Sequence, residues 1–253
     1  MQRQRGYSLI EIMIALVIAL FLLAGLGSMV SGTRKTSTNQ VSMAMLQDQE
    51  RLAMSMLNDV IQTTGYFDTA TYWSTSAAFN TSVTTTGFPT NVTLAAGQTI
   101  SGTHNTNLTT PDVIAVRYGS TGTDGVFNCT GVSSAGASTN VFYVNTTASA
   151  NQLMCSPDGT QANAIVLVDN VVNLQAYYGV STVAGACNAA GVTCNVDTYM
   201  TANNVGALWP NVVSVRVTVT FVNPLAKVNG VAQAGQPPYV YFTRVISLQG
   251  RTI

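Results

Sequence analysis

The feature that most constrains this chain is a run of 22 residues without a charged side chain, from Ile12 to Thr33. As a helix this run would be about 33 Å long at roughly 1.5 Å rise per residue, close to the ~30 Å hydrocarbon thickness of a bilayer. Arg3 and Arg5 precede it, and positive charge favours the cytoplasmic side of a membrane. We therefore expect one membrane-spanning helix with a cytoplasmic N-terminus and an exported remainder.

The helical pattern continues beyond the apolar run. No proline occurs between Tyr7 and Thr64, and apolar residues at helical spacing define one side of residues 36–64. These residues are Leu46, Ala53, Leu57, Val60 and Ile61. The glycines at positions 25, 27 and 32 are possible bends, and Gly65 is a suitable helix end because glycine adopts the left-handed conformation cheaply. The sequence predicts one helix from Tyr7 to Thr64.

The remainder of the chain has the pattern of strands and loops. In residues 212–222 valines alternate with Ser, Arg and Thr, which predicts a half-buried strand. Further strands are expected at residues 113–118, 141–144, 164–168, 171–178 and 239–248, with Asp169-Asn170 as a tight turn. For residues 69–110 we expect irregular loops and a small hairpin. The predicted fold class is α+β, a long N-terminal helix packed on an antiparallel β-sheet domain.

Composition argues against several classes of function. Only 8% of the residues are charged and the formal net charge is zero, so no basic surface for nucleic acid is expected. The single histidine, His104, leaves one candidate base for a catalytic triad. His104, Asp112 and a serine could be brought together, but no Gly-x-Ser-x-Gly or other motif supports this. We expect neither enzymatic activity nor a cofactor.

The four cysteines lie beyond the expected membrane span, at positions 129, 155, 187 and 194. Exported domains fold in an oxidising compartment, so we expect two disulfides. Four cysteines allow three connectivities, and proximity in the sequence favours Cys129 with Cys155 and Cys187 with Cys194. The Cys-x-x-Cys spacing of zinc sites is absent and no second histidine is available, so no metal site is expected.

Glu11 requires an explanation, because it stands at the start of the apolar run. A charged side chain costs about 2.5 to 3.5 kcal/mol near the centre of a bilayer and less near its surface. One simple explanation is that Glu11 lies at headgroup depth and faces water. Another is a signal peptide removed near Ser31, although the apolar part of a signal peptide usually has about 7 to 15 residues, fewer than the run found here.

The segment Gly6-Tyr7-Ser8-Leu9-Ile10-Glu11 resembles the class III signal of type IV pilins and pseudopilins. The resemblance implies that a prepilin peptidase cuts after Gly6 and that the new N-terminal residue, Tyr7, is N-methylated. It also implies that Glu11 is needed for assembly.

The resemblance to PilW-type minor pilins extends over nearly the whole chain. It is carried by residues 59–67 (DVIQTTGYF), 111–119 (PDVIAVRYG), 174–179 (LQAYYG), 199–202 (YMTA), 209–217 (WPNVVSVRV) and 244–248. The expected organisation is a leader at residues 1–6, a transmembrane and assembly part at 7–33, an amphipathic helical part at 34–65 and a globular domain at 66–253.

The resemblance further implies a structural subunit that helps to initiate pilus assembly and sits in a tip complex, with roles in twitching motility, adhesion or DNA uptake. The implied partners are prepilin peptidase, the inner membrane, and other minor pilins and the major pilin, which are contacted through a bundle of N-terminal helices. The protein is expected in the inner membrane before assembly and in a periplasmic and cell-surface pilus afterwards.

Two alternative functions stay open. A pseudopilin of a type II secretion system would have a similar signal and helix. An adhesive module at the pilus tip would use the Thr/Asn-rich loops of residues 69–110 and 180–205, although such loops are more often solvated connections.

Cleavage after Gly6 suggests a physical role for Glu11. It would expose an ammonium group on Tyr7 at the head of the apolar helix. In a bundle of such helices both charges would be buried, and breaking a buried pair costs about 3 to 5 kcal/mol. We therefore predict that Glu11 of one subunit pairs with the N-terminal amine of its neighbour, with methylation preserving the positive charge.

Overall fold

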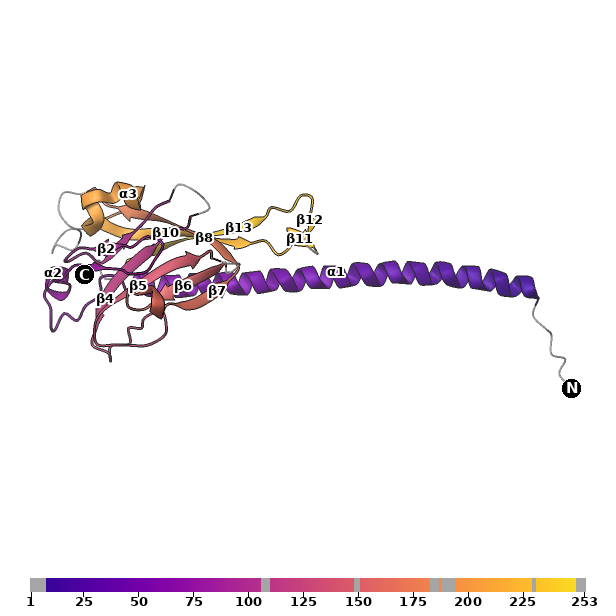
Figure 1. Ribbon diagram of the computed structural model, residues 1–253, viewed down its shortest axis with the longest axis horizontal. Helices are drawn as coiled ribbons and strands as arrows, with labels where there is room; N and C mark the ends of the chain where they lie inside the picture. The colour runs from indigo at the N-terminus through magenta and orange to yellow at the C-terminus, as the bar shows by residue number, and fades with distance from the viewer. Residues whose placement is uncertain are drawn as a thin grey trace. The chain divides into compact units, whose positions relative to one another are not determined.

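The structure is a computed structural model in which residues 8–105, 110–147, 151–182, 187, 194–228 and 231–248 are described. The chain divides into two compact units, Met1–Leu46 and Gln47–Ile253, and each is treated separately below. Figure 1 shows the order of the helices and strands along the chain.

A single helix, α1 (Leu9–Gln62), forms the described part of the first unit and continues into the second. It begins two residues later and ends two residues earlier than predicted, with Tyr7 outside the described residues. The helix passes through the three glycines at positions 25, 27 and 32 without interruption. It ends before Gly65, whose φ of 81° is the left-handed conformation expected at this position.

The second unit buries one side of the end of α1. Ala53, Met54, Leu57, Val60 and Ile61 are at most 4% exposed, and their spacing is that of one helix face. This is the apolar side that the sequence predicts, with Met54 added to it. The fold class, α+β with a long N-terminal helix and antiparallel sheets, is confirmed.

Two main antiparallel sheets are present, where the strand pattern alone suggested one. The first has the order β3-β4-β5-β6-β7. Its strands are β3 (Ile100–Gly102), β4 (Ile114–Ser120), β5 (Gly136–Asn145), β6 (Gln152–Ser156) and β7 (Ile165–Asp169). β3 and β6 were not predicted, because both are short and neither has a clear alternation of apolar and polar residues.

The second sheet has the order β13-β10-β8-β9. Its strands are β8 (Val171–Val180), β9 (Thr198–Thr201), β10 (Val212–Val222) and β13 (Tyr239–Ser247). β10 has the bounds that its alternation predicts, and Val215, Val217 and Val219 are fully buried on one of its faces. The short β9 was not predicted.

The predicted turn at Asp169-Asn170 connects the two sheets. Asn170 has a φ of 63°, a conformation that asparagine tolerates better than most residues. β7 and β8 on either side of the turn do not pair with each other, because they belong to different sheets. A strong local turn signal therefore does not by itself specify a hairpin.

Shorter elements complete the second unit. They are α2 (Thr75–Ala78), β1 (Val83–Thr84), β2 (Thr93–Leu94), the 3₁₀ helices η1 (Gln161–Asn163) and η2 (Gly206–Asn211), α3 (Ala202–Val205), β11 (Lys227–Val228) and β12 (Val231–Ala232). β1 and β2 pair as the small hairpin expected within residues 69–110. The core includes large side chains from both main sheets, among them Tyr118, Phe142, Leu174 and Phe221.

Candidate functional site

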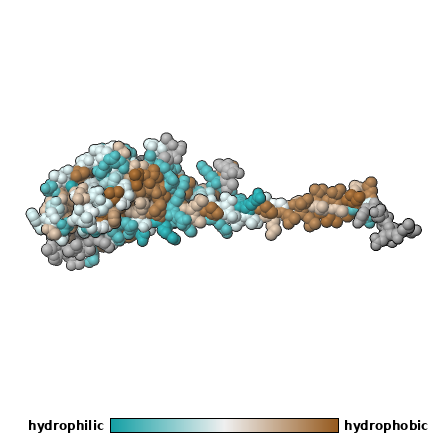
Figure 2. All heavy atoms as spheres, turned by 90° about the horizontal axis from the view of Figure 1, so that it is seen from below, coloured by the Kyte–Doolittle hydropathy of each residue, from teal (hydrophilic) through white to brown (hydrophobic). Residues whose placement is uncertain are grey.

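The first candidate site is the apolar surface of α1 within the first unit. Large apolar side chains from Leu9 to Val30 are 50% to 77% exposed, and Figure 2 shows a nearly continuous brown surface along this part of the helix. Within the described part of the chain, α1 is the one helix long and apolar enough to cross a membrane. Exposed apolar area of this extent is unfavourable in water, which indicates contact with lipid or with other helices.

Two hydroxyl groups in and next to this segment donate hydrogen bonds within the helix. Ser28 Oγ donates a hydrogen bond to Gly25 O at 2.8 Å, and Thr33 Oγ1 donates to Met29 O at 2.9 Å. A hydroxyl group bonded to its own helix can be buried in an apolar surrounding at lower cost than a free one. These polar residues are therefore compatible with lipid or with a helix bundle.

Glu11 has a local role that the sequence analysis missed. Its Oε2 accepts a hydrogen bond from the Ser8 backbone N–H at 2.9 Å, while the Glu11 N–H donates to Ser8 O at 3.0 Å. Ser8 lies immediately before the helix, so the Ser-x-x-Glu pattern supplies the glutamate half of a capping box. That pattern in the sequence could have identified the contact.

The two residues of the proposed cleavage site, Gly6 and Tyr7, lie outside the described residues. The roles assigned to these two residues stay predictions.

The four cysteines form two disulfides, Cys129–Cys155 and Cys187–Cys194. These are the pairs that proximity in the sequence favours. The first joins the segment before β5 to β6, and Cys129 and Cys155 are almost fully buried. Among the described residues, no three His, Cys, Asp or Glu side chains are grouped so that they could hold a metal ion.

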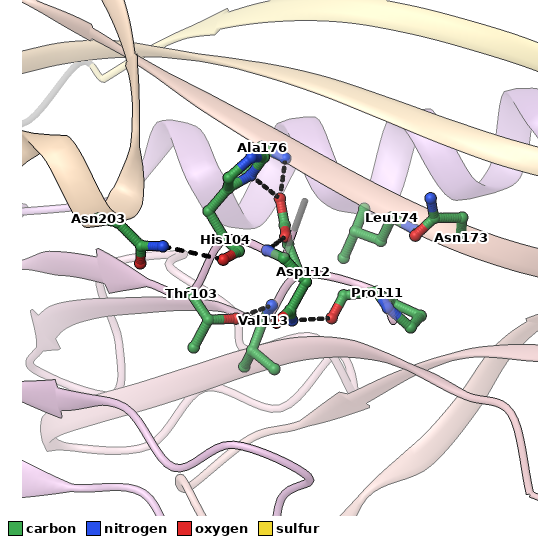
Figure 3. Close-up of polar contacts among 10 residues, drawn as sticks. Thr103, His104, Pro111, Asp112, Val113, Asn173, Leu174, Ala176 and Asn203 are labelled. Atoms are coloured by element: carbon green, nitrogen blue, oxygen red, sulfur yellow. Dashed lines mark hydrogen bonds and ion pairs between the residues drawn. The ribbon is translucent and has the colours of Figure 1, made fainter. Parts of the chain in front are cut away.

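The second candidate site is a buried carboxylate between the two main sheets. Asp112 is fully buried, and its Oδ2 accepts a hydrogen bond from the Ala176 N–H at 2.9 Å, while Oδ1 accepts one from the Asn105 N–H at 2.8 Å. His104 Nδ1 lies 3.2 Å from Oδ2. Figure 3 shows these groups converging on the carboxylate from different segments.

This arrangement favours a structural role for Asp112 over catalysis. The Asp112 N–H donates to Leu174 O at 2.8 Å, so the residue holds the β8 backbone through its main chain and its side chain. The carboxylate uses its oxygens to satisfy backbone donors, as a buried charge must. His104 is also held, because Asn203 Nδ2 donates to His104 O at 3.1 Å.

Tyr178 lies near this carboxylate. Its hydroxyl group is buried without a hydrogen-bond partner among the described residues, and its ring packs edge-on against Trp209 at 4.8 Å between centroids. Burial, and secondarily the negative charge of Asp112, raise the pKa of Tyr178 well above its usual value. The phenol is therefore a neutral core group.

Four of the segments quoted for the family resemblance meet in this part of the second unit. They contribute Asp112 (residues 111–119), Tyr177 and Tyr178 (174–179), Tyr199 (199–202), and Trp209 and Arg216 (209–217). His104 lies 5.7 Å from Tyr177 between ring centroids, and Arg216 Cζ lies 4.8 Å from the Tyr177 ring centroid and 4.9 Å from that of Tyr199. Residues far apart in the sequence thus form one stacked cluster.

Comparisons with known proteins agree with these features. Residues 141–239 match the family described as Type IV Pilus-assembly protein W, and residues 1–27 match the family described as Prokaryotic N-terminal methylation motif. No curated protein matches the chain.

A solved structure of a type IV-like pilin from Thermus thermophilus is similar to the chain, with 12% sequence identity and a TM-score of 0.41. The alignment covers 82% of this chain and 98% of that chain. The two family matches, over residues 1–27 and 141–239, support a PilW-type pilin subunit, and the apolar helix α1 and the two disulfides agree with them.

Proposed function

We propose that the protein is a minor, non-enzymatic subunit of a type IV pilus that is held in the inner membrane and then moves into a filament. The observation that carries this proposal is the exposed apolar surface of α1, headed by a single carboxylate. A helix of this kind can exchange lipid for the apolar surfaces of neighbouring helices, because both surroundings are apolar. The basic leader supports a cytoplasmic N-terminus.

The same proposal gives Glu11 two partners in succession. In the single chain its Oε2 accepts the Ser8 N–H. A carboxylate has about four acceptor positions, so this bond leaves room for the N-terminal amine of a neighbouring subunit after cleavage between Gly6 and Tyr7. The pair would set the axial position of one subunit against the next and offset the desolvation of both charges.

A place in a tip complex that initiates assembly is the finer part of the proposal. It rests on the PilW family match and on the family resemblance of the globular unit. The implied partners are other minor pilins and the major pilin through their N-terminal helices, and prepilin peptidase through the residues around Gly6.

The experiment replaces Glu11 by Val in the full chain within its native host. The variant should enter the membrane and be processed to the same mass as the wild type, but it should be lost from sheared filaments. Asp48→Asn is the matched control, because Asp48 is an exposed carboxylate on the same helix beyond the apolar run. Recovery of Glu11→Val in filaments at the wild-type level would show that the proposed ion pair is wrong.

A deletion of the gene separates the pilus from the two alternatives. Loss of surface pili and of twitching motility is the result expected for a pilus subunit. Loss of protein secretion with normal pili would instead assign the chain to a type II secretion system. Normal pili with lost attachment to surfaces would favour an adhesive module.

A further inference from the structure

The four-stranded sheet has one face in the core, and several side chains of its opposite face are partly exposed. The core face includes Leu174, Ala176, Tyr178, Val215, Val217 and Val219, all fully buried. The opposite face, here called the outer face, is defined by strand register and alternation. It comprises Asn173, Gln175, Tyr177, Gly179, Tyr199, Thr201, Ser214, Arg216, Thr218, Thr220, Tyr241, Thr243, Val245 and Ser247, with Val245 directly opposite Arg216.

Arg216 is the one charged residue on the outer face. It lies directly opposite Tyr177 across the β8–β10 pair, and its Cζ lies over the Tyr177 and Tyr199 rings at 4.8 and 4.9 Å from their centroids. Contacts of this type use the faces of the rings and leave the N–H donors in the guanidinium plane for another partner. The two rings therefore restrain the arginine without using its hydrogen-bonding edge.

Gly179 makes this arrangement possible. A Cβ atom at this position would meet the Ser214 hydroxyl, Val196 Cγ2 at 3.0 Å and Tyr199 Cε1 at 3.1 Å. The missing side chain gives the Tyr199 ring room to lie across the sheet, where its hydroxyl is 3.3 Å from Ser214 Oγ. The outer face is thus shaped around the arginine by a glycine and a second hydrogen-bonded ring.

Among the described residues, Arg216 forms no ion pair with a carboxylate. Across the described ranges the recorded ion pair joins His104 to Asp112, and no side-chain hydrogen bond there includes the Arg216 guanidinium. A restrained, half-buried guanidinium with free donors is suited to a planar carboxylate, which it can bind through two parallel N–H···O bonds. Charge complementarity therefore points to a carboxylate-bearing ligand.

The surroundings of Arg216 indicate which kind of carboxylate. Gln175 and the Thr218–Thr243 hydroxyl pair, 2.8 Å apart, offer donors and acceptors that can exchange hydrogen bonds with hydroxyl groups. Tyr241 is 59% exposed and presents an aromatic surface for the C–H groups of a sugar ring. The core of a protein–protein interface is usually more apolar than these surroundings of Arg216, which favours a polar ligand over a protein partner.

We infer that the outer face binds an acidic saccharide, with a uronate carboxylate on Arg216 and sugar hydroxyls on the neighbouring amide and hydroxyl side chains. This binding site does not depend on the proposed filament function, since it lies entirely on the second unit.

The test uses the purified full chain in detergent micelles and isothermal titration calorimetry with trigalacturonate. Fully methyl-esterified trigalacturonate is the matched ligand, because it has nearly the same shape without the negative charge. Triglutamate is the matched charge without the sugar. We expect measurable binding of trigalacturonate, at least about tenfold weaker binding of the ester, and no measurable binding of triglutamate.

The variants test the same geometry. Arg216→Lys keeps the charge but not the planar pair of donors, and should weaken trigalacturonate binding by about tenfold or more. Gly179→Ala should weaken trigalacturonate binding, because the added methyl group displaces the Tyr199 ring. Tyr199→Phe should retain most of the binding, because the ring is kept. Arg244→Lys is the control, since Arg244 is exposed on β13 but lies opposite Val217 on the other face.

Thermal unfolding of each variant shows whether the fold is retained. Arg216→Lys is a conservative change at a half-buried position, so its melting temperature should stay close to that of the wild type. The inference is overturned if trigalacturonate does not bind the wild-type chain, or if Arg216→Lys or the methyl ester leaves the affinity unchanged. Triglutamate binding as tight as trigalacturonate would overturn it too, by showing an acidic peptide site.

Discussion

Asp112 Oδ2 accepts a hydrogen bond from the Ala176 main-chain N–H at 2.9 Å, across 64 positions of the sequence. Through this bond a carboxylate at the start of one sheet holds the central part of β8 in the other sheet. The Ala176 and Asn105 N–H groups both donate to this carboxylate, so the junction depends on the Asp112 side chain.

The first prediction concerns this junction. Asp112→Asn should lower the free energy of unfolding by about 2 to 4 kcal/mol, because an amide would direct its own N–H₂ group at a backbone N–H that now finds an acceptor. Urea unfolding followed by circular dichroism measures the loss. Asp169→Asn is the control, since Asp169 is exposed and accepts one bond from Gln152; equal losses in the two variants would contradict the role of Asp112.

The second prediction compares the two disulfides. The Cys129–Cys155 bridge closes a loop with a sequence separation of 26 and the Cys187–Cys194 bridge one of 7. By the chain-entropy relation, the bridge that closes the longer loop stabilises the fold by about 3.5 kcal/mol, and the bridge that closes the shorter loop by about 2.4 kcal/mol. Each pair of cysteines is replaced by two alanines, and the free energy of unfolding is measured. It should fall further for the replacement at positions 129 and 155, because burial of these cysteines adds to the loss. A larger loss at positions 187 and 194 would reverse the expected order.

The third prediction concerns stability in acid. Burial raises the pKa of Asp158, but hydrogen bonds from Asn163, the Thr160 N–H and Ser156 outweigh this and bring the pKa below its usual value. Because the folded pKa lies below the unfolded value of about 3.9, the charged group stabilises the fold above about pH 4. That contribution is lost as the pH falls through the folded pKa.

Asp158→Asn should therefore flatten the decline in unfolding free energy between pH 5 and pH 2 relative to the wild type. Asn163→Ala should flatten it less, because one of the three donors is removed. Unfolding curves recorded across this pH range test both variants, and an unchanged pH dependence of Asp158→Asn would contradict the assignment.

The fourth prediction compares two glycines of the five-stranded sheet. A Cβ at Gly102 would meet the Tyr178 hydroxyl and the Val113 carbonyl oxygen, the latter at 2.6 Å. A Cβ at Gly119 would meet its nearest neighbours, in Phe67 and Phe79, at 3.7 Å, an ordinary contact. Gly102→Ala should lower the melting temperature by the equivalent of about 1 to 3 kcal/mol, whereas Gly119→Ala should change it much less. Equal melting temperatures would show that the backbone near Gly102 can yield.

The strands illustrate what the sequence could predict. β10 has the predicted bounds because alternation of apolar and polar residues is a local property, and its buried valines lie on the expected face. β6 was not predicted, because the five residues Gln152–Ser156 contain no clear alternation. The contact between Ser8 and Glu11 was also within reach of the sequence, since capping depends on residues three positions apart.

Other features could not be predicted because they depend on which distant strands pair. The division into two sheets separates β7 from β8 although only Asn170 lies between them. The stack of Tyr177, Arg216 and Tyr199 requires the order β10-β8-β9 and a register that places Arg216 opposite Tyr177. No local pattern contains that information.

The sequence by itself determined the long helix, its uncharged first part with Glu11 at the head, the main strands and the pairs of cysteines favoured by proximity. Each of these follows from periodicity, charge or spacing within a short stretch of chain. Only the tertiary structure decided that Asp112 joins two sheets and that Arg216 lies over two tyrosine rings. The reason is physical: backbone hydrogen bonds between remote strands set the register, and the register decides which side chains meet.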